Sequence, residues 1–97
     1  MPVNAQIEAA VLAMEAEAWT SAIAALLSAL PHVTDPAREV GVRLLLAQSL
    51  YATAQPAESR AQAERAHQQA LDLGDRGLIW KSMALLESMR IIERDRL

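Results

Sequence analysis

One pair of residues in this sequence has the spacing of a metal site. Glu64 and His67 lie three positions apart in a segment with helical periodicity, so both side chains would project from one helix face. Di-iron helix bundles use this carboxylate–imidazole spacing, but they need a second such pair and two further glutamates. The other histidine, His32, lies in a connecting segment, and no second pair occurs. We therefore expect no metal and no cofactor, and we interpret the pair as part of an exposed helix surface.

Side chains that could act as nucleophiles are absent or poorly placed. The chain has no cysteine, which excludes a thiol nucleophile, a thiolate zinc site and a disulfide framework. The serines all fall within predicted helices, where a hydroxyl bonds to a carbonyl of the preceding turn. No glycine-rich loop is present that could hold a phosphate. We predict that the protein is not an enzyme.

Charge and hydropathy narrow the classes of partner. The 97 residues suffice for one small domain covering 1–97. The net charge is −3 with both signs mixed along the chain, whereas a nucleic-acid-binding protein needs a basic face. No long apolar stretch could span a membrane, and the first residues lack the pattern of a secretory signal. We expect neither a nucleic acid nor a membrane as partner, and a cytoplasmic location.

The periodicity of the apolar residues predicts an all-helical domain, because glycine and proline are few and no β-branched run occurs. Asn4 is a candidate N-cap, Pro31 ends a helix, Asp35 and Pro36 begin another, and Gly74 suits a helix C-terminus. Local signals alone would allow one helix over 4–30, and the break near Glu17 rests on the repeat described next. The predicted helices cover residues 4–16, 17–30, 36–54, 57–73 and 76–94. The helix over 36–54 is apolar on most of its circumference, so it should be the central one.

The chain repeats itself at an offset of 37 residues. Three alanines coincide in the first helices of successive pairs, and small residues coincide at two of the three matched positions of the second helices. The coinciding sets are Ala10, Ala47 and Ala84; Ala22 and Ser59; Leu26 and Ala63; Ala29 and Ala66. Small residues at these positions would let paired helices approach closely. A helical hairpin that cannot bury its own apolar surface needs similar neighbours, so the segment 40–75 should be the unit around which the rest is built.

This pattern resembles the tetratricopeptide repeat, in which W-x₂-L-G-x₂-Y is followed by A-x₃-F-x₂-A and a proline. The matching segments are Leu46-Ala47-x₂-Leu50, Trp80-x₂-Met83-Ala84 and Trp19-x₂-Ala22-x₃-Leu26-x₂-Ala29. The segment ALDLGDRG is similar to repeat boundaries in the bacterial regulators that include the maltose activator. The period departs from the family's 34 residues, and alanine replaces its glycine. The resemblance implies antiparallel helical hairpins stacked as a short array of about five helices. A five-helix bundle with coincidental alanine spacing is the structural alternative.

The resemblance also implies a function. Ligands of that family usually lie in a concave groove lined by the first helix of each pair. By position, the groove would be lined by Ile7, Val11, Met14, Leu44, Gln48, Tyr51, Leu78, Lys81, Leu85 and Met89. Leu44, Leu78 and Leu85 are better explained as core residues. The residues predicted to contact a partner are Gln48, Tyr51, Lys81, Met89, Val11 and Met14. We expect a scaffold or adaptor that binds a peptide or helix of another protein.

The last predicted helix is apolar on two sides. Leu78, Leu85, Met89 and Ile92 form one side, and Trp80, Ala84 and Ile91 form a second stripe. A terminal helix needs only one covered face, so Trp80, Ala84 and Ile91 are predicted to mediate self-association as a homodimer or docking to a larger partner. A helical-bundle sensor for small molecules and a metal-binding domain are the alternative functions. Ligand-dependent tryptophan fluorescence would favour the first, and bound metal in elemental analysis the second.

Overall fold

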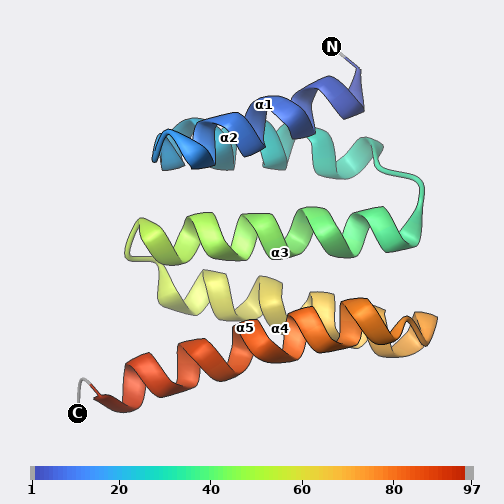
Figure 1. Cartoon of the computed structure of the whole chain (residues 1–97). Helices are drawn as coiled ribbons and strands as arrows, with labels where there is room; N and C mark the ends of the chain where they lie inside the picture. The colour runs from blue at the N-terminus through green and yellow to red at the C-terminus, as the bar shows by residue number, and fades with distance from the viewer. Residues whose placement is uncertain (1, 96–97) are drawn as a thin grey trace.

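The computed structural model describes residues 2–95 and contains five α-helices (Figure 1). They are α1 (Val3–Glu15), α2 (Trp19–Ala29), α3 (Pro36–Ala52), α4 (Pro56–Leu73) and α5 (Arg76–Asp95), with a short 3₁₀ turn, η1 (Leu30–His32), after α2. The described residues contain no strand. The predicted all-helical class and the number of helices are confirmed.

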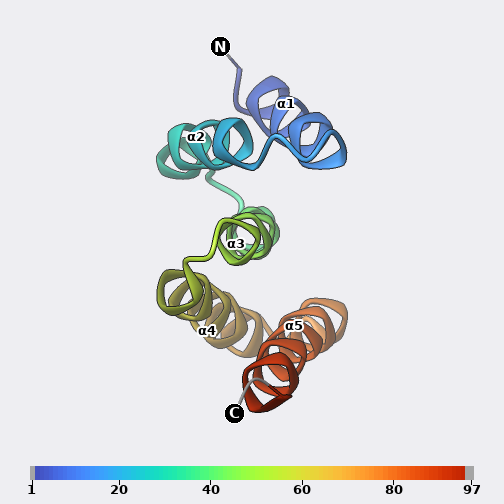
Figure 2. The ribbon, with the colours of Figure 1, turned by 90° about the vertical axis from the view of Figure 1, so that its left-hand side faces the viewer.

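The helices form antiparallel hairpins stacked side by side. α1 pairs with α2 and α3 with α4, while α5 packs mainly on α4. α1, α3 and α5 run in one direction and α2 and α4 in the other (Figure 1). Viewed along the helices, α1 and α5 lie on one side, α2 and α4 on the other, and α3 between them (Figure 2). The extents of 43 × 32 × 18 Å match a slab about two helices thick, not a bundle around one centre.

The break between α1 and α2 lies where the repeat places it. Glu17 adopts a left-handed φ of 58°, and the Ala18 N–H donates to the Ala13 carbonyl over 2.7 Å. This bond closes the end of α1 in the manner of a Schellman motif, although the left-handed residue is not glycine. The predicted break near Glu17 is confirmed. The prediction that Asn4 caps α1 is wrong: the helix already includes Val3, and no side chain caps its first turn.

The other helix ends follow their local chemistry. The Asp35 carboxylate accepts a hydrogen bond of 3.3 Å from the Ala37 N–H, and Pro36 occupies the first helical position of α3. Gly74 ends α4 with a φ of 69°, a conformation that costs L residues with a Cβ more than it costs glycine. Asp75 Oδ1 then accepts from the Leu78 N–H over 3.1 Å at the start of α5. These boundary predictions are confirmed.

The core lies where hairpin helices cross, and α3 is its centre. Eight residues of α3 are buried, which confirms the prediction of a central helix. The equivalent residues of the first two pairs, all of them small except Leu26, are fully buried, namely Ala10, Ala47, Ala22, Ser59, Leu26, Ala63, Ala29 and Ala66. At the α3–α4 crossing, the Ser59 hydroxyl donates to the Ala47 carbonyl oxygen over 2.6 Å. Such a contact requires the two backbones to lie close together, because one short side chain spans the gap.

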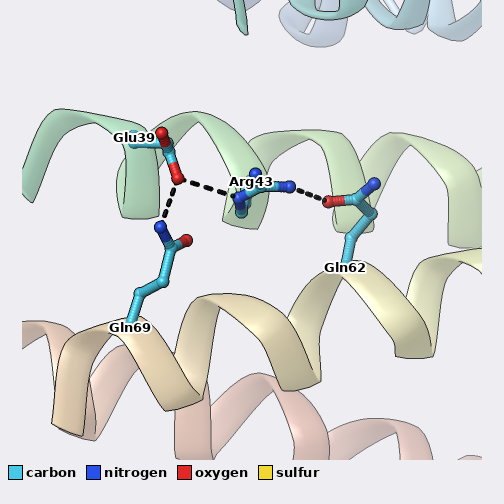
Figure 3. A network of polar contacts seen from close by, with 4 residues as sticks. All are labelled: Glu39, Arg43, Gln62 and Gln69. Atoms are coloured by element: carbon cyan, nitrogen blue, oxygen red, sulfur yellow. Dashed lines mark hydrogen bonds and ion pairs between the residues drawn. The ribbon is translucent and has the colours of Figure 1, made fainter. Parts of the chain in front are cut away.

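A polar network adds specificity to the α3–α4 hairpin (Figure 3). Arg43 Nε lies 3.3 Å from Glu39 Oε2, and Arg43 Nη1 donates to Gln62 Oε1 over 3.0 Å. Gln69 of α4 donates to the same oxygen of Glu39. The hydrogen bond from Gln69 and the charge of Arg43 hold the pKa of Glu39 below its ordinary value, against the opposing effect of burial. The network therefore joins α3 to α4 most strongly when Glu39 is ionised.

Candidate functional site

A groove with a volume of about 740 Å³ opens on the side of the slab formed by α1, α3 and α5. Figure 2 shows why: α1 and α5 flank this side and α3 lies recessed between them. The groove is lined by Ile7, Arg38, Gly41, Val42, Leu44, Leu45, Gln48, Leu78, Trp80, Lys81, Ala84, Leu85 and Ser88. We call this surface the groove. Its volume falls within the range typical of ligand-binding sites, roughly 300–1,000 Å³.

Helical spacing brings these residues together. On α3 the lining runs from Arg38 through Gly41 and Leu45 to Gln48, in steps of three and four residues that stay on one face. Ten residues of helix separate the first from the last, which corresponds to a length of about 15 Å. On α5 the lining that starts at Leu78 advances by the same steps. The floor is thus long enough for three successive side chains of a helix that lies along it.

The polar groups of the groove are few, and the charged ones are cationic. Arg38 and Lys81 are exposed and make no ion pair with any described residue. Gln48 is exposed and Ser88 contributes a hydroxyl at the opposite wall. No carboxylate is among the described residues that line the groove. The local charge is therefore positive, although the whole chain carries −3.

Of the residues predicted to contact a partner, Gln48 and Lys81 line the groove. Val11 and Met14 are half-buried on α1 and lie outside the lining. Tyr51 is half-buried and packs against the cluster at the α3–α4 crossing, with its hydroxyl buried. The groove is consequently shorter along α1 than the position-by-position comparison implied, and along α3 it ends at Gln48 instead of Tyr51.

The placement of Met89 corrects a prediction. Met89 is only 2% exposed and packs against Ala47 and Ala63, with its sulfur 3.9 Å from the Ser59 hydroxyl. A side chain in that position cannot contact a partner in the groove. The small residues of the α3–α4 crossing leave space that the long, flexible methionine of α5 fills.

Sequence reasoning missed seven of the lining residues, namely Arg38, Gly41, Val42, Leu45, Trp80, Ala84 and Ser88. Arg38 and Gly41 lie ten and seven positions before Gln48, so extending its helical face toward the N-terminus would have found them. Trp80 and Ala84 were assigned to the second apolar stripe alone. The structure shows that they form the edge shared by the groove and that stripe.

A second, smaller hollow of about 480 Å³ lies beyond this shared edge. It is lined by Trp80, Met83, Ala84, Glu87, Ser88 and Ile91, all of α5. The three residues predicted to mediate self-association are therefore together on this side of the helix. Trp80 is 68% exposed and Ile91 is 42% exposed. Large apolar side chains with this exposure are common at surfaces that bind other proteins.

The Glu64–His67 pair does not gather further ligands. His67 Nδ1 lies 2.8 Å from the Ser82 hydroxyl of α5, and that hydroxyl also bonds to the Leu78 carbonyl over 2.9 Å. Which of the two groups donates in the His67–Ser82 bond depends on the tautomer of the imidazole ring. Glu64 is exposed, and the described residues contain no group of three His, Asp or Glu side chains that could hold a metal ion. His67 thus serves to join α4 to α5.

Comparison with known protein families, with curated proteins and with solved structures finds no match. Among residues 2–95, none of the helices has the length and apolar character needed to cross a membrane.

Proposed function

We propose that the protein is a tetratricopeptide-like scaffold that binds an amphipathic helix of another protein in the groove. The observation that carries this proposal is the apolar groove along α3, whose charged groups Arg38 and Lys81 pair with no carboxylate of the described residues. The 37-residue repeat supports the family resemblance, because its equivalent positions are buried at equivalent helix crossings in the first two pairs. The proposal includes no catalytic step.

A helix suits this groove better than an extended peptide. An extended segment binds tightly when its backbone pairs with a sheet edge, and the described residues contain no strand. A helix satisfies its own backbone groups and needs only apolar anchors spaced at i, i+3 or i+4, and i+7. That spacing covers about 10 Å and fits the floor between Arg38 and Gln48.

The two cations of the groove predict which charges the partner helix carries beside its apolar anchors. Arg38 and Lys81 would be matched by aspartate or glutamate beside the apolar anchors, because opposite charges across an interface favour both encounter and register. We therefore propose an acidic amphipathic helix as the occupant. Each rim pair contributes little, roughly 0.2–1 kcal/mol, so the apolar anchors must supply most of the affinity.

Selection from a displayed library of helical peptides tests the proposal directly. Peptides selected on the wild-type chain should carry the apolar spacing and acidic flanks described above. Gln48→Trp should abolish their binding, because Gln48 is exposed on the groove floor and tryptophan would fill the space without touching the core. A selection that gives no binder, or binders that tolerate Gln48→Trp, would refute the proposed function.

Charge reversal tests the partner chemistry separately. Arg38→Glu should weaken the binding of an acidic peptide about fivefold, which corresponds to about 1 kcal/mol of binding free energy, because a weak attraction becomes a repulsion. Arg38 lies in the first turn of α3, where a carboxylate favours the helix dipole, so loss of binding would not reflect unfolding. Arg76→Glu is the matched control, since Arg76 is an exposed cation in the first turn of α5 outside the groove lining. Equal effects of the two variants would contradict an acidic occupant.

A further inference from the structure

One of three equivalent alanines is left uncovered. Ala10 and Ala47 are fully buried, the first beside Leu26 of α2 and the second beside Ala63 of α4. In each case the following helix of the hairpin covers the alanine. Ala84 occupies the same position of the repeat on α5, yet it is exposed. The face that α1 and α3 use to form their hairpins is therefore open on α5.

The open face has a definite composition. At 100° per residue, Ala84 and six side chains from the two turns on either side of it lie within about 60° of its direction around the helix axis. We call them the outer face of α5: Gly77, Trp80, Lys81, Ala84, Glu87, Ser88 and Ile91. All seven are exposed, and five of them also line the smaller hollow. The face combines two large apolar groups, three small residues and one charge of each sign.

We propose that the outer face of α5 pairs with the same face of α5 in a second copy of the chain, antiparallel and with Ala84 at the crossing. The third hairpin would then be completed between two molecules, in the orientation that α1–α2 and α3–α4 have within one. A twofold axis through the crossing makes the contact self-complementary. This surface does not include the floor of the groove on α3, although four of its residues, Trp80, Lys81, Ala84 and Ser88, also line the wall of the groove on α5.

The register follows from side-chain size. When Ala84 of one copy lies opposite Ala84 of the other, the sequence numbers of any two residues at the same height along the contact add to 168. Trp80 then faces Ser88 of the second copy, and Ile91 faces Gly77. Each large side chain thus meets a small one, which leaves room for the two helices to pack closely.

Charge selects the same register. Lys81 and Glu87 of the second copy then lie at the same height along the contact, on opposite edges of it, and the twofold axis produces this combination twice; Glu87 also pairs with Arg90 of its own helix over 2.7 Å. Lys81 has no carboxylate three or four positions away in its own helix and forms no ion pair with the described residues. Shifting the register so that Trp80 faces Ile91 would place Lys81 opposite Arg90, which is repulsive. Size and charge therefore agree on Ala84 as the crossing point.

The contact uses one helix from each copy. Stable complexes bury about 800 Å² on each partner, and a single helix face covers less than that. The dimer should consequently dissociate on dilution, and association has to be measured over a concentration series reaching about 1 mM. Over that series the mean mass from sedimentation equilibrium should rise from 10.6 kDa toward twice this value.

Opposite charge reversals on the two members of the pair give the test of register. Lys81→Glu and Glu87→Lys should each raise the dimer dissociation constant by about tenfold, because the four charges at positions 81 and 87 of the two copies then all have the same sign. An equimolar mixture of the two variants should recover wild-type affinity. In the mixed dimer the two introduced side chains, which have opposite charges, face each other, and the other pair across the axis is the native Lys81 with the native Glu87. Residues six positions apart in one helix do not meet, so recovery on mixing can come only from contact between molecules. Arg38→Glu is the control of equal charge change and should dimerise like the wild type.

The outcomes separate this proposal from the groove. A wild-type chain that stays at 10.6 kDa throughout the series overturns the dimer. Dimers unaffected by the reversals, or variants that do not recover on mixing, overturn the outer face or its register. Glu87 is outside the groove lining, so Glu87→Lys should still bind the selected acidic peptides. Circular dichroism of every variant establishes that it is folded.

Discussion

Replacing alanine by leucine should have opposite consequences at equivalent positions of the repeat. Ala47 is fully buried at the α3–α4 crossing between Ala63 and Met89, and Ala10 is fully buried in the first hairpin. Leucine adds three carbon atoms there, and the helices must separate or adopt strained rotamers, which costs about 1–3 kcal/mol. At exposed Ala84 the same change should alter the free energy of unfolding by less than about 0.5 kcal/mol.

The difference is large on the scale of this domain. A chain of 97 residues has a total stability of about 5–15 kcal/mol, so Ala47→Leu removes a substantial part of it. A loss of 1–3 kcal/mol corresponds to a decrease in Tm of roughly 4–20 °C for a domain of this size, whereas Ala84→Leu should change Tm by no more than a few degrees. Helix propensity does not account for the contrast, because leucine and alanine are both strong helix formers.

Urea and thermal unfolding, followed by circular dichroism at low protein concentration, would measure these differences. Ala61→Leu, at an exposed alanine of α4, is the control for leucine on a helix surface. If Ala84→Leu destabilises as much as Ala47→Leu, the outer face of α5 is covered within the monomer and our reasoning fails. If Ala10→Leu and Ala47→Leu are both tolerated, the hairpins do not cross as closely as the structure shows. At high concentration Ala84→Leu should in addition prevent dimerisation.

Four further predictions concern the hairpin contacts and the exposed tryptophan. Arg43→Met keeps the apolar part of the side chain but removes its hydrogen bond to Gln62 of α4 and its ion pair with Glu39 of α3, and should cost about 1–2 kcal/mol in urea unfolding. Because the hydrogen bond from Gln69 and the charge of Arg43 lower the pKa of Glu39, its ionised form stabilises the fold above the ordinary value of 4.5. That contribution is lost as the pH falls through the lower folded-state pKa, so the stability difference between wild type and Glu39→Gln should shrink there; a pH-independent difference would contradict this. Gly74→Ala should cost about 1 kcal/mol in thermal unfolding, because the φ of 69° is unfavourable for alanine. Trp80→Asp should leave the unfolding midpoint nearly unchanged while preventing association in sedimentation, since the side chain is 68% exposed; global unfolding would place it in the core.

Sequence reasoning succeeded where the determinants are local or repeated. Asp35 before Pro36, and Gly74 before Asp75, specify helix ends through bonds made within a few residues, so these boundaries could be read directly. The break at Glu17 carries no glycine or proline, and only comparison with the second pair placed it. The prediction for Asn4 was wrong because α1 already begins at Val3. Asn4 therefore lies inside the helix, and its side chain does not cap the first turn.

The candidate site was predicted only in part, because a residue lines a groove only where the helices packed around it leave its side chain accessible. Gln48 and Lys81 line the groove, as their positions in the repeat implied, and their contact with a partner stays a prediction. Arg38, just inside α3, was missed because the comparison carried over fewer positions than the groove occupies. The pair Glu64 and His67 had suitable spacing, but only the structure shows that His67 faces Ser82 of the next helix.

By itself, the sequence determined the helices, their ends and the small residues at which they cross, since these depend on periodicity, caps and side-chain size along the chain. The tertiary structure decided how α5 is rotated about its own axis. Both sides of that helix are apolar, so periodicity could not distinguish Met89, which fills the space beside Ala47, from Trp80, which faces outward. Burial belongs to a pair of surfaces, and only the packed structure shows that Ala84, unlike Ala10 and Ala47, has no helix of the described residues over it.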